Sequence, residues 1–489
     1  MKPIKSFRKY VETLKEHNEV VSITQEVDWD LEMSAITRRA YDLPSPAPLF
    51  KNIKGCMPGF EVLGAPVGLS PNKEHPFIRV ALSLGLPVNT PAPEIIKAWS
   101  KLADVKPIPP RQVETGECKE NKLFGDEIDL TKLPVPYIHV GDGGRYINTY
   151  GILIVRTPDG SWVNWAISRV MLDGPRSLSG VIIPTQDLGK IYAEWKKIGK
   201  EMPYALCLGV DPGIAMIAGY PLPGNVSEGE LLGGWYGEAI DVVKCETNDL
   251  LVPATTEIII EGTASLDRTV PEGPMGEYGG YVWVGRNKQV PLFKVNALTH
   301  RNNPIMPICV AGVPTEENHT NWGISIAAAL HNDLNGKGLP VKRSFITLES
   351  AVHWYIVTVD PNRQEPDDAK LAREIGETVF ASRAGSYVPN VIVLDDDIDP
   401  SNLGRVVWGF STRNRPDSRI LLENQAMFPL VAYLRPEEKS IPKNTKVVYN
   451  CLTPFRTWPK ENQPVEASWE SYPEELRNSI IRNWKEYGF

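Results

Sequence analysis

The chain has 489 residues, more than one hydrophobic core usually organises, so we expect two or three domains. Its net charge of −8 and pI near 5.6 argue against nucleic acid as a partner, because phosphate backbones select a basic face. The six cysteines form no C-x-x-C pair and no zinc spacing, which favours the reducing cytoplasm. No run approaches the roughly 18 apolar residues of a membrane span, so we predict a cytoplasmic protein without a membrane segment.

The first part of the chain mixes helix and strand patterns. Ser6 stands at an N-cap position before apolar residues at helical spacing, which predicts a helix over residues 7–15. The Pro-rich segment 106–111 then stiffens the chain, so we predict an α/β domain at residues 1–115. Its other expected elements are strands at 20–27 and 60–64 and helices at 30–41 and 91–102.

From residue 121 strand patterns predominate. The Thr-Pro-Asp-Gly sequence at 157–160 predicts a hairpin between an apolar strand at 150–156 and a returning strand at 162–171. Ser227 and Glu230 have the spacing of a capping box. We assign residues 116–315 to one mainly β body, with a helix at 184–197 and further strands at 181–183, 205–210, 214–219, 256–262, 292–297 and 305–311.

The last part alternates helix and strand patterns, which predicts a second α/β domain at residues 316–489. Residues 472–487 read as an amphipathic helix with several apolar residues on one face. A terminal helix of this kind suits docking on a partner subunit. The expected elements before it are helices at 324–334 and 367–384 and strands at 353–359, 391–394 and 406–410.

Two short stretches carry the candidate chemistry. Residues 164–169 place an amide, a hydroxyl and the cation of Arg169 on a predicted strand, and residues 272–277 place Glu272 and Glu277 on a Gly/Pro-shaped loop. Two acids and a cation that tunes them form an acid/base set. Asn164 and Arg169 point to opposite faces of a regular strand, so the backbone must bend between them if both reach one ligand.

These stretches belong to an ordered series of motifs that resembles the UbiD family of reversible, prenylated-FMN-dependent decarboxylases. Within that family the motifs are most similar to those of the ferulic/cinnamic and hydroxybenzoic (gallic-type) acid decarboxylases. Any one short match is weak, whereas the order of all of them makes chance a poor explanation. The motifs are at residues 119–121, 141–144, 164–169, 225–228, 243–254 and 272–277.

The resemblance implies an α/β multidomain chain with an N-terminal α/β domain and a C-terminal α/β oligomerisation domain. Between them it implies a flavin-reductase-like split β-barrel that binds prenylated FMN, with Mn²⁺ at the phosphate and K⁺ nearby. The implied metal ligands are Asn164, Asp187 and Glu228, with Asp187 where close relatives place a histidine. The implied cofactor contacts are Asn164, Ala166, Ile167, Ser168, Arg169, Gln186 and Glu228.

The resemblance also assigns the chemistry. Arg169 and Glu272 match the catalytic network in which Glu277 donates the proton that replaces CO₂. Losing CO₂ from an sp² carbon requires an electron-accepting cofactor, because no side chain delocalises the resulting carbanion. The implied partners are an aromatic carboxylic acid, CO₂, a flavin prenyltransferase as cofactor supplier, and a second copy of the chain in a homodimer or larger homo-oligomer.

The implied substrate pocket contains Trp322, His353, Tyr355 and Tyr387, which favour a flat ring with polar substituents and hence an aromatic or heteroaromatic acid. Three alternatives stay open: a cinnamate-type substrate, an FMN-dependent oxidoreductase on the same barrel, and a non-catalytic flavin-binding or assembly subunit. Taken singly, most of these residues also suit structural roles. Arg169 and Glu277 suit an ion pair, Asp187 and Glu228 suit helix N-termini, and residues 141–144 read as a turn.

Overall fold

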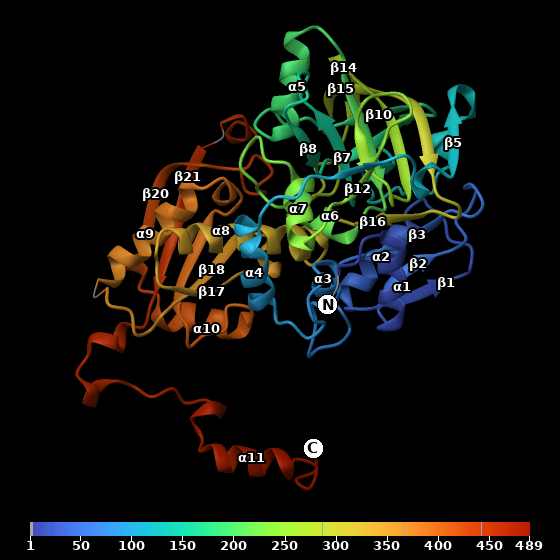
Figure 1. Cartoon of the computed structure of the whole chain (residues 1–489). Coiled ribbons are helices and arrows are strands. Elements are labelled where there is room, and N and C mark those ends of the chain that lie inside the picture. The colour runs from blue at the N-terminus through green and yellow to red at the C-terminus, as the bar shows by residue number, and fades with distance from the viewer. Residues whose placement is uncertain (1–2, 286, 366, 442) are drawn as a thin grey trace.

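A computed structural model describes residues 3–285, 287–365, 367–441 and 443–489. The fold is mixed α/β, with a large β body flanked by a sheet from the N-terminal part and another from the C-terminal part (Figure 1). The predicted boundaries at 115/116 and 315/316 stay a prediction. Among the described residues, no helix has the length and apolar character to cross a membrane.

The N-terminal sheet has the strand order β1-β2-β3-β16. Its last strand, β16 (Ile305–Ile308), pairs in parallel with β3 (Glu61–Gly64), so a strand from far along the chain completes this sheet. The Ser6 Oγ accepts the backbone N–H of Lys9 at 3.2 Å, which confirms the predicted cap. The other elements are α1 (Phe7–Glu16), β1 (Val20–Ile23), α2 (Glu32–Asp42), β2 (Ala47–Phe50), α3 (Ile78–Ser83) and α4 (Ala92–Ser100).

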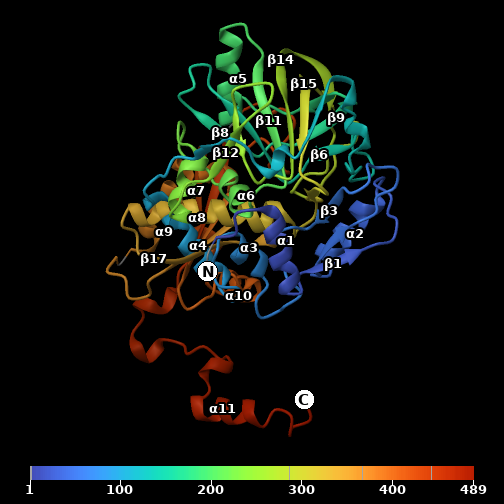
Figure 2. The same cartoon turned by 45° about the vertical axis from the view of Figure 1, so that its right-hand side comes forward.

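The central body is an antiparallel sheet that curls into a half-barrel (Figures 1 and 2). Its strand order is β6-β9-β10-β15-β14-β11-β7-β8, and β5 pairs with β15. The strands are β5 (Asn121–Phe124), β6 (Tyr146–Asn148), β7 (Gly151–Arg156), β8 (Val163–Ala166), β9 (Val170–Gly174), β10 (Ser177–Gly180), β11 (Met202–Leu208), β14 (Ile258–Glu272) and β15 (Lys288–His300). The predicted hairpin is confirmed, because β7 pairs antiparallel with β8.

Three helices of this part pack near β7 and β8: α5 (Asp187–Lys197), α6 (Pro212–Ala218) and α7 (Glu228–Tyr236). A small sheet of order β13-β12-β4 lies beside them. Its strands are β4 (Arg111–Val113), β12 (Asp241–Lys244) and β13 (Leu251–Pro253).

The C-terminal sheet has the order β17-β18-β19-β21-β20, with β18, β19 and β21 parallel. Helix α8 packs on α4 and β17 and thereby joins the first and last parts of the chain. The elements are η5 (Asn318–Trp322), α8 (Gly323–Gly336), β17 (Val341–Ile346), β18 (Trp354–Val359), α9 (Asp368–Ala381), η7 (Ala384–Tyr387), β19 (Asn390–Asp395), α10 (Leu403–Arg413), β20 (Ile420–Ala426) and β21 (Lys443–Cys451).

Three strand predictions are wrong. Residues 214–218 lie in α6 and Gly219 is its C-cap, because Asp211 caps the backbone N–H of Gly213 at 2.8 Å and Pro212 occupies the first turn. Residues 406–410 lie in α10, where the Asn402 Oδ1 accepts the backbone N–H of Arg405 at 3.1 Å. Residues 181–183 follow β10 as irregular chain. Ser227 is the N-cap of α7, but its side chain makes no capping bond.

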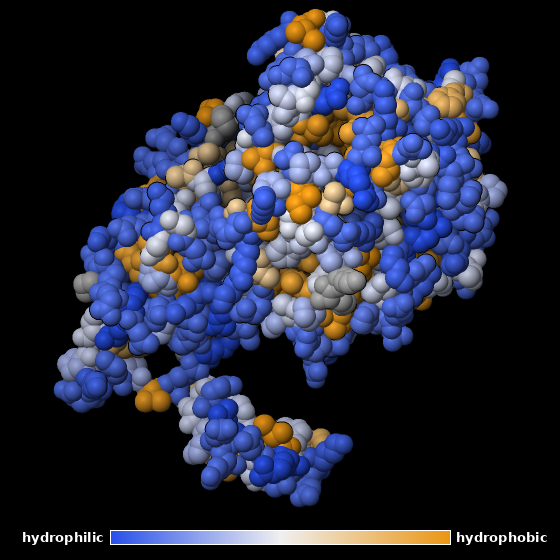
Figure 3. Space-filling model, in the orientation of Figure 1, coloured by the Kyte–Doolittle hydropathy of each residue, from blue (hydrophilic) through white to orange (hydrophobic). Residues whose placement is uncertain are grey.

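The C-terminal tail runs away from the body to α11 (Glu474–Arg482), which lies apart from the rest in both views (Figures 1 and 2). Apolar side chains lie on its surface (Figure 3), among them Leu476, Ile481 and Trp484 at 46%, 61% and 49% exposure. Isolated helices of this length are marginal in water, so we expect packing against another surface to stabilise α11.

Candidate active site

Arg169 joins the two predicted acids. Its guanidinium makes a bidentate contact with Glu272, at 2.8 Å from Nε to Oε1 and 2.9 Å from Nη2 to Oε2. The Nη1 of the same side chain donates to Glu277. Glu272 is 1% exposed. Since a bidentate bond fixes both position and orientation, Arg169 is held at a defined place between the carboxyl groups.

The backbone bends where the sequence requires it. Strand β8 ends at Ala166 and β9 begins at Val170, so the predicted single strand at 162–171 is interrupted by residues 167–169. The Asn148 Nδ2 donates to the Ser168 carbonyl at 2.6 Å and thereby holds the interruption in place. Arg169 therefore lies outside β8, and the alternation of side chains along that strand does not fix the direction of its side chain.

Glu277 lies in a poorly hydrated position on residues 272–278, which we call the acid loop. Burial raises the pKa of this carboxyl above its ordinary value, the Arg169 cation opposes the rise and the Glu272 charge adds to it. For Arg169, burial lowers the pKa, but the two carboxylates outweigh it and raise the pKa overall. The arrangement combines a permanent cation with an acid that retains its proton to higher pH than usual.

Tyr146 is a part of this network that the sequence analysis missed. Its hydroxyl donates to the Glu272 Oε1 at 2.8 Å and lies 3.2 Å from the carbonyl of Pro274. Tyr146 is fully buried on β6, two residues after the Gly141–Gly144 motif. Its position close to this motif is the only signal in the sequence that could have selected Tyr146, because a buried tyrosine by itself is typical of a hydrophobic core.

A second cluster joins β8 to α7. The Asn164 Nδ2 donates to the Glu228 Oε1 at 2.9 Å, and the backbone N–H of Trp165 donates to Oε2 at 3.0 Å. Burial raises the pKa of Glu228 to about 7, although these bonds oppose the rise. The Asn164 Oδ1 is buried without a hydrogen-bond partner among the described residues. An unpaired amide oxygen beside a buried carboxyl is a donor set that suits a hard cation.

Asp187, the third predicted metal ligand, has other partners. Its Oδ1 lies 2.9 Å from the Lys190 Nζ, and its Oδ2 accepts the Arg383 Nη2 at 2.6 Å. Asp187 lies at the start of α5 and is 7% exposed. Both of its oxygens are therefore paired with cations, whereas Asn164 and Glu228 face each other directly.

The remaining predicted cofactor contacts lie at the end of β8, in the residues that follow it, and just before α5. Ala166 ends β8, Ser168 donates from Oγ to the Val181 carbonyl at 3.1 Å, and Gln186 precedes α5 without a capping bond. Ile167 is 44% exposed and lines a cavity of about 30 Å³ together with Trp322. A predicted cofactor contact, Ile167, and a predicted pocket residue, Trp322, thus line the same cavity.

Three of the predicted pocket residues gather around Tyr278, which directly follows Glu277. The Tyr278 ring lies edge-on to Trp322 at 5.2 Å and stacks with His353 at 6.2 Å. Tyr387 lies 4.9 Å from Trp322. Phe428 completes this aromatic cluster, and sequence reasoning did not select it or Tyr278.

Tyr355 lies elsewhere. It is 0% exposed on β18 and belongs to the hydrophobic core, and no ring contact with the aromatic cluster is seen among the described residues. The start of the strand explains the difference: His353 precedes β18 in irregular chain, so it does not follow the alternation that would place it on the same face as the buried Tyr355.

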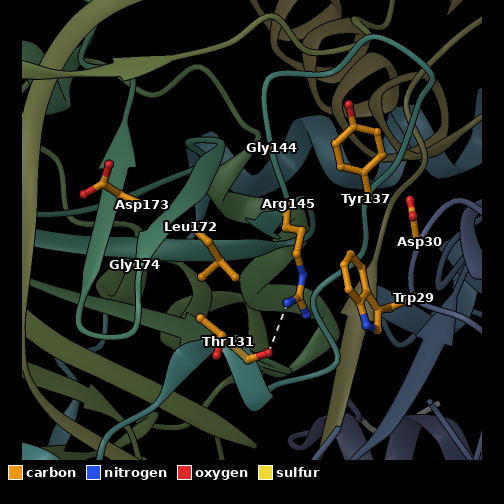
Figure 4. Close-up of a pocket in the computed structure, with 9 residues that line it drawn as sticks. All are labelled: Trp29, Asp30, Thr131, Tyr137, Gly144, Arg145, Leu172, Asp173 and Gly174. Atoms are coloured by element: carbon orange, nitrogen blue, oxygen red, sulfur yellow. Dashed lines mark hydrogen bonds between the residues drawn. The ribbon is translucent and has the colours of Figure 1, made fainter. Parts of the chain in front are cut away.

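Two other features are not candidate catalytic centres. An open hollow of about 600 Å³ lies beside Arg145, but this guanidinium donates to the carbonyls of Thr131, Leu133 and Val135 and covers the Trp29 ring (Figure 4). Cys309, Glu316 and Glu317 form a buried cluster with metal-ligand spacing. Its carboxyl groups already accept hydrogen bonds. Glu316 accepts from the Cys309 thiol and the Asn318 backbone N–H, and Glu317 accepts from the Tyr41 hydroxyl and the Val67 backbone N–H.

Comparison with known proteins identifies the family. The models for the N-terminal, Rift-related and C-terminal domains of 3-octaprenyl-4-hydroxybenzoate carboxy-lyase match residues 11–99, 111–314 and 319–451. The chain belongs to the UbiD family. It is 42% identical to the pyrrole-2-carboxylic acid decarboxylase of Pseudomonas aeruginosa over 99% of this chain and 98% of that protein.

Two further relatives agree with the family. Ferulic acid decarboxylase 1 of Saccharomyces cerevisiae is 37% identical, over 100% of this chain and 99% of its own length. The UbiD-class enzyme HmfF from Pelotomaculum thermopropionicum, solved in complex with FMN, superposes with a TM-score of 0.81 at 25% identity, over 95% of this chain and 97% of that chain. The UbiD fold and the carboxy-lyase class are therefore established for this chain.

Removing the Tyr146 hydroxyl tests the support of Glu272. We expect Tyr146→Phe to lower the free energy of unfolding by about 1.5–3 kcal/mol in urea, because the bond is made to a buried charged group. Tyr204→Phe is the matched control, since its buried hydroxyl donates to a neutral carbonyl, that of Lys294, at 3.1 Å and removing it should cost about 0.5–1.5 kcal/mol. Equal costs for the two variants would contradict the assignment.

Proposed function

We propose that this carboxy-lyase decarboxylates an aromatic or heteroaromatic carboxylic acid reversibly with prenylated FMN, and that Glu277 donates the proton that replaces CO₂. The observation that carries the proposal is the network in which Arg169 bonds both Glu272 and Glu277. The alternative functions do not require this network. An FMN-dependent oxidoreductase needs no proton donor of raised pKa at this place, and a non-catalytic assembly subunit needs no acid pair.

The side chains divide the work according to their bonds. Glu272 is buried and bonded by Arg169 and Tyr146, so it fixes the cation and has little freedom to move. Glu277 is bonded through Arg169, and its side chain is 18% exposed. Because burial raises its pKa, Glu277 keeps its proton to higher pH than an ordinary carboxyl and can deliver it to the carbon that CO₂ leaves.

Prenylated FMN supplies the electron sink for the carbon that loses CO₂. We propose that Ala166, Ile167, Ser168, Arg169 and Gln186 contact it along the edge of β8. Asn164 and Glu228 fit a Mn²⁺ ion at its phosphate, since the Asn164 Oδ1 is buried and unpaired among the described residues and Glu228 is a buried carboxyl. Asp187 would join them only by leaving Lys190 or Arg383. K⁺ and supply of the cofactor by a flavin prenyltransferase rest on the family resemblance.

The aromatic cluster supports the substrate class. Trp322 and His353 contact Tyr278, the neighbour of Glu277, and Tyr387 packs on Trp322, so this cluster offers flat faces to a ring. The relative that decarboxylates pyrrole-2-carboxylic acid supports a heteroaromatic acid. A cinnamate-type acid is the second candidate, because a relative of 37% identity is a ferulic acid decarboxylase.

We also propose a homodimer or larger homo-oligomer, with α11 docked on a neighbouring copy of the chain. The support is the position of α11 away from its own body together with its exposed apolar side chains. The helix carries both signs of charge at its ends, with Glu474 and Glu475 in the first turn and Arg482 in the last.

Replacing the proton donor tests the function. We expect Glu277→Gln to lower turnover of the aryl or heteroaryl acid by about 10²–10⁴-fold, because an amide cannot donate the proton that replaces CO₂. The protein is produced with a flavin prenyltransferase, and acid consumption is followed by ultraviolet absorbance over a panel that includes cinnamate. Mass and visible spectrum of the bound cofactor serve as the control and should not change. Full turnover by the variant would refute the proposal.

The pH dependence follows from the same group. A proton donor works only while protonated, so kcat/KM should be constant below the raised pKa of Glu277 and should fall as pH rises through it. Glu272→Gln removes a like charge that raises this pKa, so the falling limb should move to lower pH. The measurement is the pH profile of both proteins; a limb at the same pH in both would contradict the coupling.

Deleting residues 457–489 tests the assembly. We expect a smaller oligomer in size-exclusion chromatography with light scattering, because the deletion removes apolar side chains such as Phe489, which is 74% exposed. Ile481→Ser with Trp484→Ser should weaken the assembly in the same direction while leaving the chain length unchanged. An unchanged mass for the truncated protein would show that α11 does not hold the copies together.

A further inference from the structure

The acid loop rests on residues 139–144, which include the family motif at 141–144 that by itself read as a turn. The backbone N–H of Gly143 donates to the Pro274 carbonyl at 2.7 Å. A Cβ on Gly143 would overlap the Gly273 carbonyl, and a Cβ on Gly276 would overlap the His139 ring. The two segments are therefore in direct contact at positions that exclude side chains.

Asp142 joins the turn to the loop. Its Oδ1 accepts the backbone N–H of Gly276 at 2.9 Å, and its Oδ2 accepts the backbone N–H of His139 at 2.9 Å. The Asp142 side chain is fully buried. On the outer side, facing the hollow of Figure 4, the Tyr137 hydroxyl donates to the Asp142 carbonyl at 2.5 Å. Gly276 directly precedes Glu277, so this carboxylate holds the backbone next to the proton donor.

The His139 ring bridges Asp142 to a third segment. Its Nδ1 lies 3.1 Å from the Asp142 Oδ2, and its Nε2 lies 2.6 Å from the Ala311 carbonyl. Both partners are acceptors, so a ring with a proton on each nitrogen satisfies both contacts.

The other end of the acid loop has a matching histidine. The Nε2 of His319 faces the Tyr278 carbonyl at 3.1 Å, and its Nδ1 accepts the backbone N–H of Glu316 at 3.1 Å. Burial lowers the pKa of His319 to about 4, so the ring is neutral near pH 7 and donates from Nε2. The loop is thus held on both sides of Glu277, by Asp142 and His139 before it and by His319 after it.

We propose that His139 is a positioning residue for decarboxylation, which sets the place of Glu277 by bonding Asp142 and Ala311 at once. The inference rests on the proposed role of Glu277 as proton donor. His139 does not touch Glu277 itself; it acts through Asp142 and Gly276. A small displacement of the donor is sufficient to lower turnover, because proton transfer requires hydrogen-bond distance.

Three substitutions separate the two bonds. The amide nitrogen of asparagine can replace Nδ1 and that of glutamine can replace Nε2, so His139→Asn keeps the Asp142 bond and His139→Gln keeps the Ala311 bond, while His139→Ala keeps neither. In holoenzyme we expect kcat to fall about 100-fold for His139→Ala and about tenfold for each of the other two. KM and cofactor content should stay within about threefold, because the pocket is not altered.

Hydrogen exchange provides a readout besides activity. The Gly276 amide is protected by Asp142, so peptides that contain it should exchange at least about tenfold faster in His139→Ala holoenzyme. His300→Gln is the matched control: this histidine is 9% exposed and bonds the Arg301 carbonyl at 2.7 Å, away from the acid loop. It should change neither kcat nor exchange at Gly276.

The outcomes are distinct. Wild-type kcat in His139→Ala, or wild-type exchange at Gly276, would overturn the inference. Loss of cofactor or of folded protein in all three variants, in proportion to lost turnover, would also overturn it, because His139 would then be structural. Failure of the proposed function gives a different result. If the Glu277→Gln variant remains active, Glu277 is not the proton donor, whereas faster exchange at Gly276 in His139→Ala still demonstrates that His139 supports the bond between Asp142 and Gly276.

Discussion

The buried bidentate pair between Arg169 and Glu272 is the interaction on which the rest of the site depends. A buried carboxylate without a partner would be costly, and so would a buried guanidinium, so each requires the other. Tyr146 supplies a further bond to Glu272. With one acid fixed in this way, the remaining hydrogen-bonding edge of Arg169 is available for Glu277.

This arrangement separates the two carboxyl groups by role. Glu272 is bonded on several sides, whereas Glu277 is bonded through Arg169 and directly precedes Tyr278 of the aromatic cluster. Burial and the neighbouring charge both favour its protonated form. The same fold thus provides, from one residue type, an anchored carboxylate and the carboxyl that we propose as the proton donor, and the difference arises from the number of bonds each carboxyl accepts.

The site is assembled from segments that are distant in the chain. Arg169 comes from the interruption between β8 and β9, the acid loop follows β14, and Trp322 and His353 come from the C-terminal part. Helix α8 packs on α4 and β16 pairs with β3, so the three parts of the chain are joined by regular elements near the site. Histidines at each end of the acid loop connect it to the segment around residues 311–319.

The sequence by itself determined the family, the β-rich centre, the hairpin of β7 and β8, and the acid set of Arg169, Glu272 and Glu277, because ordered motifs and alternation are local properties of the chain. It did not determine α6 or α10, where caps at Asp211 and Asn402 outweighed strand-like composition. Only the tertiary structure decided that Tyr146 bonds Glu272, that the His139 ring packs against Gly276 and that Tyr278 joins the aromatic cluster. It also decided that Tyr355 belongs to the core and that Asp187 is paired with Arg383. Those outcomes depend on which segments meet in space, and no local pattern encodes the partner of a buried side chain.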